Sequence, residues 1–316
     1  MTGIELLRSR LIWGLVLALV LIALPFGLPS FWVALMTEML IWGLLAMSLD
    51  ILLGYAGMPS FGHAAFFGAA AYVGAILSTR YGMGFWLSGL SGVAFAIAVA
   101  LLFGLLVAHA TGVYFLMITF ALGMCLWGLA MRWTDMTGAD MGIYGIPRPE
   151  IGLPLDMYNP LTFYFFTLVI FALVSLCLYT LVKSPFGQSL KGIRESESRM
   201  RVLGYHTWLH RYMAFVIAGA FAGVAGVLWA YCQGGVSPGD LDFLACMRPF
   251  IMCILGGPGT MLGPAIGSGI YVFLEHFISA YTQRWQIFVG VVFILVLFYA
   301  PMGLVNWVKM KIFTKP

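Results

Sequence analysis

Long stretches without a charged residue constrain the fold of this chain more than any other feature. They cover residues 11–37, 51–79, 81–131, 157–182, 212–239, 249–274 and 285–308. A transmembrane helix needs about 20 consecutive, mostly apolar residues. Each stretch can therefore hold a membrane span, and the one at 81–131 is long enough for two. The sequence predicts an integral membrane protein.

Composition excludes a soluble fold and a disordered chain. Charged residues make up 9% of the chain and hydrophobic residues 62%, whereas about 25% of the residues in a typical soluble domain are charged. A disordered chain would need low hydrophobicity and high charge. We therefore expect an all-α, polytopic membrane protein in which residues 1–316 form a single transmembrane domain. Helices are expected near 11–29, 31–53, 62–79, 85–108, 111–131, 161–182, 212–232, 243–256, 261–281 and 285–307.

Positive charge predicts which side of the membrane each loop faces, because short cytoplasmic loops carry an excess of Lys and Arg. The loop at 183–211 holds six such residues and is expected inside, whereas the mainly acidic loop at 132–160 is expected outside. Basic residues near both ends of the chain place the two termini inside. The number of crossings must then be even, which favours ten segments over nine, with 243–256 as the short extra one. The expected location is a bacterial inner membrane.

A glycine-rich stretch at 53–68 is the most informative part of the membrane region. Gly54, Gly57, Pro59 and Gly62 lie close together, and this density of Gly and Pro breaks a helix. Irregular backbone at membrane depth must line a cavity or be buried in protein, and broken helices often form the site of a transporter. A tight cytoplasmic turn, with glycines for close packing, explains the same residues equally well.

A second glycine-rich stretch, at 255–267, repeats this pattern. Both begin with Leu-Gly-x-x-Gly and continue with Gly and Ala before a helix, which suggests a distant internal repeat. The GxxxG patterns at 219–223 and 263–267 are interpreted as seams of close helix packing.

Ionisable residues are rare within the expected spans. Because a charge in lipid is costly, each should face the bundle interior or an interface. Glu38 is the deepest and could pair with a substrate ammonium or with an internal partner. Asp50, Glu275 and His276 lie nearer the span ends and are expected to be structural.

The loop at 183–211 contains an amphipathic pattern. Phe186, Leu190, Ile193, Met200 and Leu203 recur at spacings of three, four and seven residues, which predicts a helix or a helix pair. Glycine at 204 is a natural helix end. Such a helix could lie on lipid headgroups or dock onto a soluble partner, and docking is the favoured interpretation.

Several other functions lack the residues they need. There is no P-loop motif, so the chain is not expected to hold ATP itself. His206 and His210 have no third ligand nearby, so no metal site is expected, and Ser60 does not stand in a Gly-x-Ser-x-Gly elbow. No catalytic residue and no nucleic-acid partner are expected. A stand-alone secondary carrier would have only Glu38 and Asp50 as coupling charges.

Four stretches together resemble LivM-type permeases of branched-chain amino acid ABC transporters. They are GYAGMPSFGHAAFFG at 54–68, GVYFLMITFA at 112–121 with WTDMTGADMGIYGIP at 133–147, SPFGQSLKGIRE at 184–195 with Leu-Gly at 203–204, and LGGPGTMLGP at 255–264. Their order and spacing also fit that family. The resemblance covers residues 35–305, nearly the whole chain.

This resemblance implies one of two related permease subunits of an ABC importer for branched-chain or related hydrophobic amino acids. The chain would pair with a LivH-type sister permease. Two ATPase subunits, which carry ATP and Mg²⁺, would bind inside, and a periplasmic substrate-binding protein would dock outside. Importers of urea, short amides and aromatic acids share this family, so another small organic substrate is an alternative. The secondary carrier is a less favoured one.

The resemblance also implies roles for individual residues. Loop 183–211 matches the cytoplasmic coupling segment of ABC importers, although Ser196, Ser198 and Arg199 stand where alanines are usual. The residues expected to couple to the ATPases are Phe186, Leu190, Ile193, Arg194, Glu197, Leu203 and Gly204. Those expected along the translocation path are Glu38, Gly54, Gly57, Ser60, Gly62, His63, Thr119, Gly256, Gly257 and Gly259.

Overall fold

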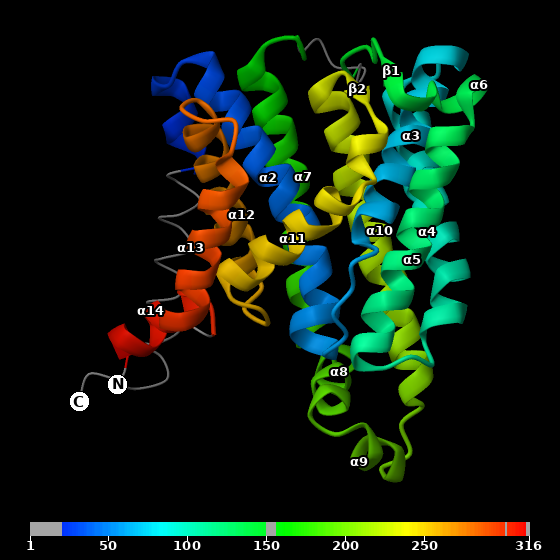
Figure 1. The fold of residues 1–316 in the computed structure, drawn as a ribbon, viewed down its shortest axis with the longest axis vertical. Coiled ribbons are helices and arrows are strands. Elements are labelled where there is room, and N and C mark those ends of the chain that lie inside the picture. Colours follow the sequence, from blue (N-terminus) through cyan, green and yellow to red (C-terminus); the bar gives the residue numbers. More distant parts are fainter. Residues whose placement is uncertain (1–20, 150–155, 301, 314–316) are drawn as a thin grey trace.

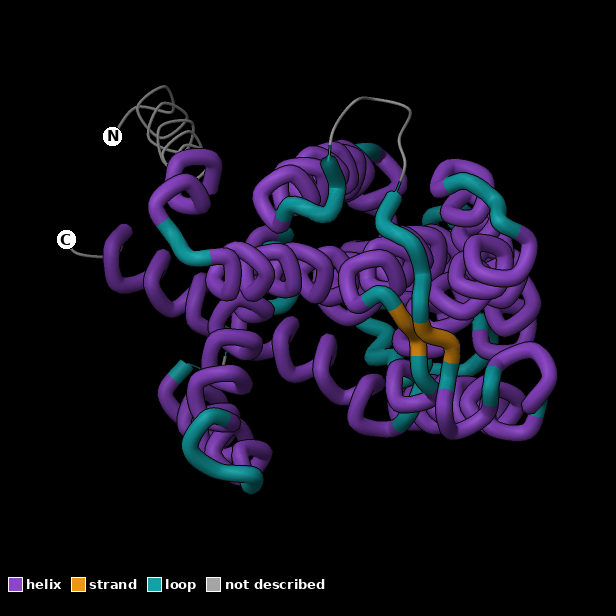
Figure 2. The backbone as a smooth tube through the Cα atoms, turned by 90° about the horizontal axis from the view of Figure 1, so that it is seen from above, coloured by secondary structure: helices purple, strands orange, loops and turns teal. Residues whose placement is uncertain are grey.

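The computed structural model describes residues 21–149, 156–300 and 302–313, and most of them are helical (Figure 1). Six helices in this part of the chain are long and apolar enough to cross a membrane. The all-α, polytopic architecture predicted from the sequence is therefore confirmed. In Figure 2, two short strands are the only orange segments of the described tube.

The elements follow one another in this order: η1 (Leu24–Gly27), α2 (Ser30–Asp50), η2 (Ile51–Ala56), α3 (His63–Tyr81), α4 (Phe85–Val107), α5 (Gly112–Arg132), α6 (Thr134–Thr137), η3 (Ala139–Met141), β1 (Ile143–Tyr144), α7 (Pro160–Lys183), α8 (Pro185–Glu195), α9 (Glu197–Val202), α10 (Thr207–Gln233), β2 (Gly235–Val236), η4 (Pro238–Asp240), α11 (Phe243–Gly256), α12 (Leu262–Ser279), α13 (Trp285–Tyr299) and α14 (Leu304–Phe313).

Two helices occupy the centre of the bundle. We compare the most apolar 18 residues of each span. In α2 with η2, 89% of these residues are buried, and in α10 72% are, whereas in α4, α5, α7 and α13 only 18–33% are buried. A helix that is apolar on all sides is stable only when protein or lipid surrounds it. The central pair is surrounded by protein, and the other four leave much of their surface uncovered by the rest of the chain.

Small residues allow α10 to lie at the centre. It packs against α3 and α4, and a side chain at Gly226 would collide with the backbone of Phe67. Gly219 and Gly223 meet the methyl groups of Ala100 and Ala96 in the same way. The GxxxG stretch at 219–223 is thus a packing seam, as the sequence predicts.

The expected helix break at 54–62 is present. Helix α2 continues as a single π-helical stretch, η2, which ends at Gly57 with φ +70°. Residues 57–62 have no regular secondary structure; this stretch, called the extended segment below, leads directly into α3. Figure 1 shows this light-blue segment running back alongside the bundle before α3 begins, so it is not a turn beyond the helix ends. Met58, Ser60 and Gly62 of this irregular stretch are buried, and Gly54, Gly57 and Gly62 pack closely against other elements, so the structure contains features of both alternatives.

The short segment predicted near 243–256 is also present, as α11. Its 14 residues rise about 21 Å, less than the roughly 30 Å of a hydrocarbon core. Helix α11 lies obliquely across the front of the bundle in Figure 1, and the 257–261 loop returns the chain into α12.

The two large loops lie at opposite ends of the bundle, as predicted. Helices α8 and α9 form one end, and the ribbon of β1 and β2 lies at the other (Figure 1). The ribbon pairs Ile143 with Val236 and Tyr144 with Gly235, which ties loop 132–160 to the end of α10. Hydrophobic periodicity along single spans could not reveal so short a pairing.

Two details at the chain ends differ from the expectation or lie beyond it. The helix expected over 285–307 ends at Tyr299, and α14 begins at Leu304. The sequence has a proline at 301, which cannot donate a helical hydrogen bond and so favours a break there. Of the helix expected at 11–29, residues 11–20 lie outside the described residues, as do the basic residues of the N-terminus.

Candidate functional site

The two glycine-rich segments meet in the structure, although the contacting residues, Gly54 and Gly259, are 205 positions apart in the sequence. A side chain at Gly54 would collide with the backbone nitrogen of Gly259 and with the carboxylate of Asp50. Only glycine permits the backbones of η2 and the 257–261 loop to come so close. The weak sequence echo between the two segments therefore corresponds to a direct contact.

Asp50 holds this contact together. Its side chain is fully buried, and its Oδ1 accepts hydrogen bonds from the Gly259 backbone N–H at 2.7 Å and from the Cys253 thiol at 3.5 Å. Its Oδ2 has no hydrogen-bond partner among the described residues. The carboxylate thus connects the end of α2 with both α11 and the loop after it.

Helix α8 reaches the same point through one arginine. Arg194 donates a hydrogen bond from Nη1 to the carbonyl of Gly54. Its aliphatic part covers Gly57, where an added Cβ would lie 2.8 Å from the Arg194 Cγ. We call Asp50, Gly54, Arg194, Cys253 and Gly259 the coupling junction. It brings the 183–211 loop into contact with both breaks in the helical bundle.

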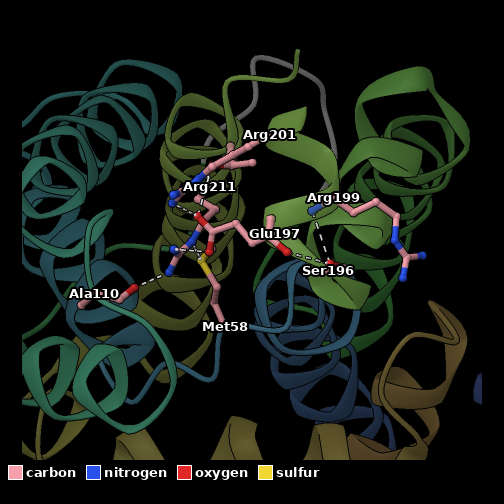
Figure 3. Close-up of polar contacts among 9 residues, drawn as sticks. Met58, Ala110, Ser196, Glu197, Arg199, Arg201 and Arg211 are labelled. Atoms are coloured by element: carbon pink, nitrogen blue, oxygen red, sulfur yellow. Dashed lines mark hydrogen bonds and ion pairs between the residues drawn. The ribbon is translucent and has the colours of Figure 1, made fainter. Parts of the chain in front are cut away.

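Helix α9 makes a second connection, shown in Figure 3. Glu197 pairs with Arg201 at 2.5 Å and with Arg211 of α10 at 3.5 Å. Arg211 is buried; it donates to the sulfur of Met58 at 3.0 Å and to the carbonyl of Ala110. A series of polar contacts, from Glu197 through Arg211 to Met58, therefore connects α9 with the extended segment 57–62.

Glu197 is held in its charged form. Partial burial raises the pKa of its carboxyl, but the hydrogen bond from Arg201 and the positive charge of Arg211 outweigh burial and lower the pKa below its usual value. The carboxylate is ionised at neutral pH, as the ion pair with Arg211 requires.

The apolar face of α8 packs against the bundle. Leu190 and Ile193 are buried and Phe186 is half-buried, so these three anchor the helix and do not present an apolar face to solvent. At the tip of α9, Val202 is 87% exposed and Leu203 65%. Gly204, with φ +86°, ends the pair. The two predicted helices are separated at Ser196, whose hydroxyl accepts the Arg199 N–H and caps α9.

The extended segment rests on α5. The Phe61 N–H donates to the hydroxyl of Thr119 at 3.3 Å, and Gly62 lies against the Thr119 backbone. Ser60 and His63 are fully buried, and neither ring nitrogen of His63 has a hydrogen-bond partner among the described residues. The structure thus brings the predicted path residues at 54–63 and 119 together.

Two aromatic contacts join this region to α11. The rings of Phe61 and Phe250 are 4.8 Å apart, edge to face, and those of Phe120 and Phe243 are 5.5 Å apart. Positions 243 and 250 are seven residues apart and share one face of α11. At the end of α11, Gly256 lies against Gly263, and Gly257 lies beside Met302 and Gly303. Gly256 and Gly257 therefore pack where α11, α12 and the residues before α14 meet, whereas the third predicted path glycine of this stretch, Gly259, belongs to the coupling junction.

Glu38 lies apart from the coupling junction. Its carboxylate pairs with His276 at 2.9 Å, and it precedes Asp50 by twelve residues on α2, a rise of about 18 Å. Glu38 and Asp50 share no contact, so the structure does not build the charge relay that a secondary carrier would need from them.

Sequence reasoning missed Asp50, Arg211 and Cys253 as members of this site. Asp50 precedes Gly54 by one helical turn, which places a carboxylate beside the break and is a usable signal. Arg211 stands at the start of an otherwise apolar span, and the cost of burying its charge predicts an ionic partner. Cys253 carries no comparable signal, because buried cysteines are usually plain core residues.

Comparison with known proteins identifies the family to which this architecture belongs. The family model described as "Branched-chain amino acid transport system / permease component" matches residues 31–297. The chain belongs to this permease family. Both glycine-rich segments, α8 and α9 lie inside the matched region, so the coupling junction is built from residues within it.

Individual relatives agree with that assignment. The permease is 27% identical over 309 residues to the high-affinity branched-chain amino acid transport system permease protein LivM of Escherichia coli. This match covers 90% of this chain and 72% of the Escherichia coli protein. It is 29% identical over 180 residues, 52% of each chain, to a probable LivM of Methanocaldococcus jannaschii. It is also 33% identical to the LivH permease of Escherichia coli over 125 residues, 39% of this chain and 40% of that one. No solved structure matches the permease.

Proposed function

We propose that the chain is a transmembrane permease subunit of an ABC importer that carries branched-chain or related hydrophobic amino acids across the inner membrane. Membership of the permease family supports transport, and likeness to LivM and LivH proteins supports this substrate class and a sister permease of the LivH type. Two ATPase subunits, which hold ATP and Mg²⁺, bind at α8 and α9. A substrate-binding protein docks at the end that carries β1 and β2.

The observation that carries this proposal is the double attachment of α8 and α9. Arg194 links α8 to Gly54, and Glu197 links α9 through Arg211 to Met58. A displacement of this helix pair by the ATPases therefore acts on both ends of the 54–58 stretch. The extended segment carries Phe61, which contacts Phe250 of α11. The motion separates or closes this aromatic contact and so changes the side to which the path opens.

Charge supports the proposed orientation. The end with α8 and α9 carries Lys183, Lys191, Arg194, Arg199 and Arg201, as cytoplasmic loops do. The opposite end exposes Asp135, Asp140 and Asp156. Cytoplasmic ATPases then meet the basic end, and a periplasmic protein meets the acidic one.

Co-purification tests the proposal at its central point. We expect a tagged chain, extracted gently with its native partners, to retain a P-loop ATPase. The double variant Val202→Asp with Leu203→Asp should lose that ATPase, because it places charge on the exposed apolar tip of α9. Met141→Asp, a matched control on the opposite end with 82% exposure, should keep it. Retention of the ATPase by the α9 variant would contradict this docking surface.

Uptake tests the substrate. The purified complex, reconstituted in proteoliposomes with its binding protein and ATP, should accumulate radiolabelled L-leucine. Accumulation of urea or a short amide without leucine would move the substrate to another branch of the same family. Uptake without any ATPase subunit would favour the secondary carrier.

A further inference from the structure

Four ionisable residues meet within the membrane region, away from the coupling junction. Arg248 of α11 pairs with Glu275 of α12 at 3.0 Å, and His276 of α12 meets Glu38 of α2 at 2.9 Å. Glu275 lies within range of the charges of Glu38 and His276 as well. We call Glu38, Arg248, Glu275 and His276 the ionic cluster. It joins three helices that pack against one another.

The ionic cluster lies in the half of the bundle that carries the β-ribbon. Glu38 is eight residues, about 12 Å, into α2 from its start at that end. The four side chains are partly open, with exposures of 16% for Glu38, 28% for Arg248, 15% for Glu275 and 37% for His276. Charges at membrane depth are costly against lipid and mark substrate or ion pathways. We therefore expect these four partly exposed side chains to line a path that contains water.

Aromatic rings lie beside the charged groups of the cluster, which suits a ligand that has both charged groups and an apolar part. The Arg248 guanidinium lies over the ring of Trp42, 5.4 Å from its centroid, and Phe31 stands edge-on to His276 at 6.4 Å. The opposite face of α11 carries Phe250, which contacts Phe61 of the extended segment. One short helix therefore connects the ionic cluster with the part of the protein that the coupling junction moves.

We propose that the ionic cluster is a transient binding site for the α-ammonium and α-carboxylate groups of the transported amino acid. Arg248 donates to the carboxylate, and Glu38 accepts from the ammonium in place of His276. The inference rests on the proposed amino-acid transport and adds the recognition chemistry to it.

Charge balance supports a zwitterionic ligand. The cluster holds two acids, one arginine and one histidine, joined in two pairs. When His276 is protonated, the cluster carries two charges of each sign, and an α-amino acid, which brings one more of each sign, can exchange partners with both pairs and leave no charge unpaired. A ligand with a single charge would leave one unpaired charge at membrane depth, which is costly. Exchange of one pair for another gives weak binding, and a site on a pathway must release its ligand.

Variants of Arg248 test the inference in the complete, reconstituted transporter with its binding protein, ATP and radiolabelled L-leucine. Loss of a charge-assisted hydrogen bond should lower leucine transport in Arg248→Gln by about tenfold. Stimulation of ATP hydrolysis by the loaded binding protein should stay within about twofold, because docking and coupling remain. Arg248→Lys should recover part of the transport. Arg284→Gln, an exposed arginine beyond the same end of α12, should behave as the wild type.

A double variant separates ligand binding from structure. Arg248→Gln with Glu275→Gln removes both members of one pair, so no charge is left unpaired. If the pair is only structural, this double variant recovers transport, which would overturn the inference. If Arg248 binds the substrate, the double variant stays about tenfold impaired. Absence of leucine uptake by the wild type would instead refute the proposed function. The two failures are therefore distinguishable, because the first is seen only in the variants and the second already in the wild type.

Accessibility supplies a test that does not depend on the stability of the arginine variants. In the assembled transporter, Glu38→Cys should react with a hydrophilic, membrane-impermeant thiol reagent, measured against the parent chain. Leucine presented by the binding protein under turnover should slow that reaction. A cysteine at 38 that does not react in any state would place the cluster off the path and overturn the inference.

Discussion

At the scale of single residues, close approach between backbones carries the candidate site. Gly54 lies so near Gly259 and Asp50 that any side chain must push η2 away from the 257–261 loop. The hydrogen bond from Gly259 to Asp50 would then lengthen, and the buried carboxylate would lose a partner. Such a loss is costly because a buried carboxylate depends on its remaining hydrogen bonds to offset desolvation.

We therefore expect Gly54→Ala to insert into the membrane and to lose leucine uptake by about tenfold or more, the effect of one charge-assisted hydrogen bond. The control is Gly128→Ala in α5, where an added Cβ meets nothing within 4 Å. That substitution should leave uptake unchanged. Equal uptake by the two variants, measured in proteoliposomes, would contradict the importance of the backbone contact.

Glu197 provides a second prediction at this scale. Its pKa is lowered in the folded protein, so the ion pair stabilises the α9 attachment above the ordinary carboxyl pKa and loses that effect as the pH falls through the lower, folded value. Glu197→Gln should lower uptake at pH 7 by about tenfold, because buried Arg211 loses its partner. Glu195→Gln, two residues away and without an ion pair among the described residues, should not.

The acid dependence checks the same pair independently. Below pH 4.5 the wild-type α9 region should become more accessible to proteolysis as Glu197 gains a proton. The Gln variant should already be accessible at pH 7 and should show no further change from this residue. Identical protection of both proteins at neutral pH would rule out the ion pair as the attachment.

At the scale of elements, the extended segment and α11 form the moving parts of the proposed cycle. Phe61 and Phe250 face each other at 4.8 Å. We expect a short, reducible bifunctional thiol cross-linker between Phe61→Cys and Phe250→Cys to abolish uptake, and reduction of the cross-linker to restore it. The control cross-links Phe26→Cys to Phe165→Cys, a pair of similar ring spacing at 5.5 Å between η1 and α7, and should transport in both states. Full transport by the cross-linked Phe61–Phe250 pair would show that this contact does not open.

Most elements could be predicted from the sequence, because charge-free runs and Gly-Pro density act locally. The break after Gly54 and the short helix α11 follow from such signals. The contact of Arg194 with Gly54 joins positions 140 residues apart, and no periodicity carries that information. The burial of the Leu190 face follows from the position of α8 beneath the bundle, which the amphipathic pattern alone does not distinguish from docking onto a partner.

At the scale of the whole molecule, charge asymmetry separates the two ends. The end with α8 and α9 is basic and the end with the β-ribbon is acidic, which predicts that the former lies in the cytoplasm. In the proposed importer, the ATPases and the binding protein work on opposite sides of the membrane. This orientation therefore decides whether the coupling junction can receive the force of ATP hydrolysis.

Cysteine labelling tests that orientation on two matched positions. Met141 and Val202 are exposed by 82% and 87% at opposite ends of the protein, so burial does not distinguish them. In intact spheroplasts, an impermeant thiol reagent should label Met141→Cys and should reach Val202→Cys only after permeabilisation. The parent chain corrects for the native cysteines. Labelling of Val202→Cys in intact cells would place α8 and α9 outside, where cytoplasmic ATPases could not reach them, and the proposed coupling would fail even though the contacts of Arg194 and Glu197 remained as they are.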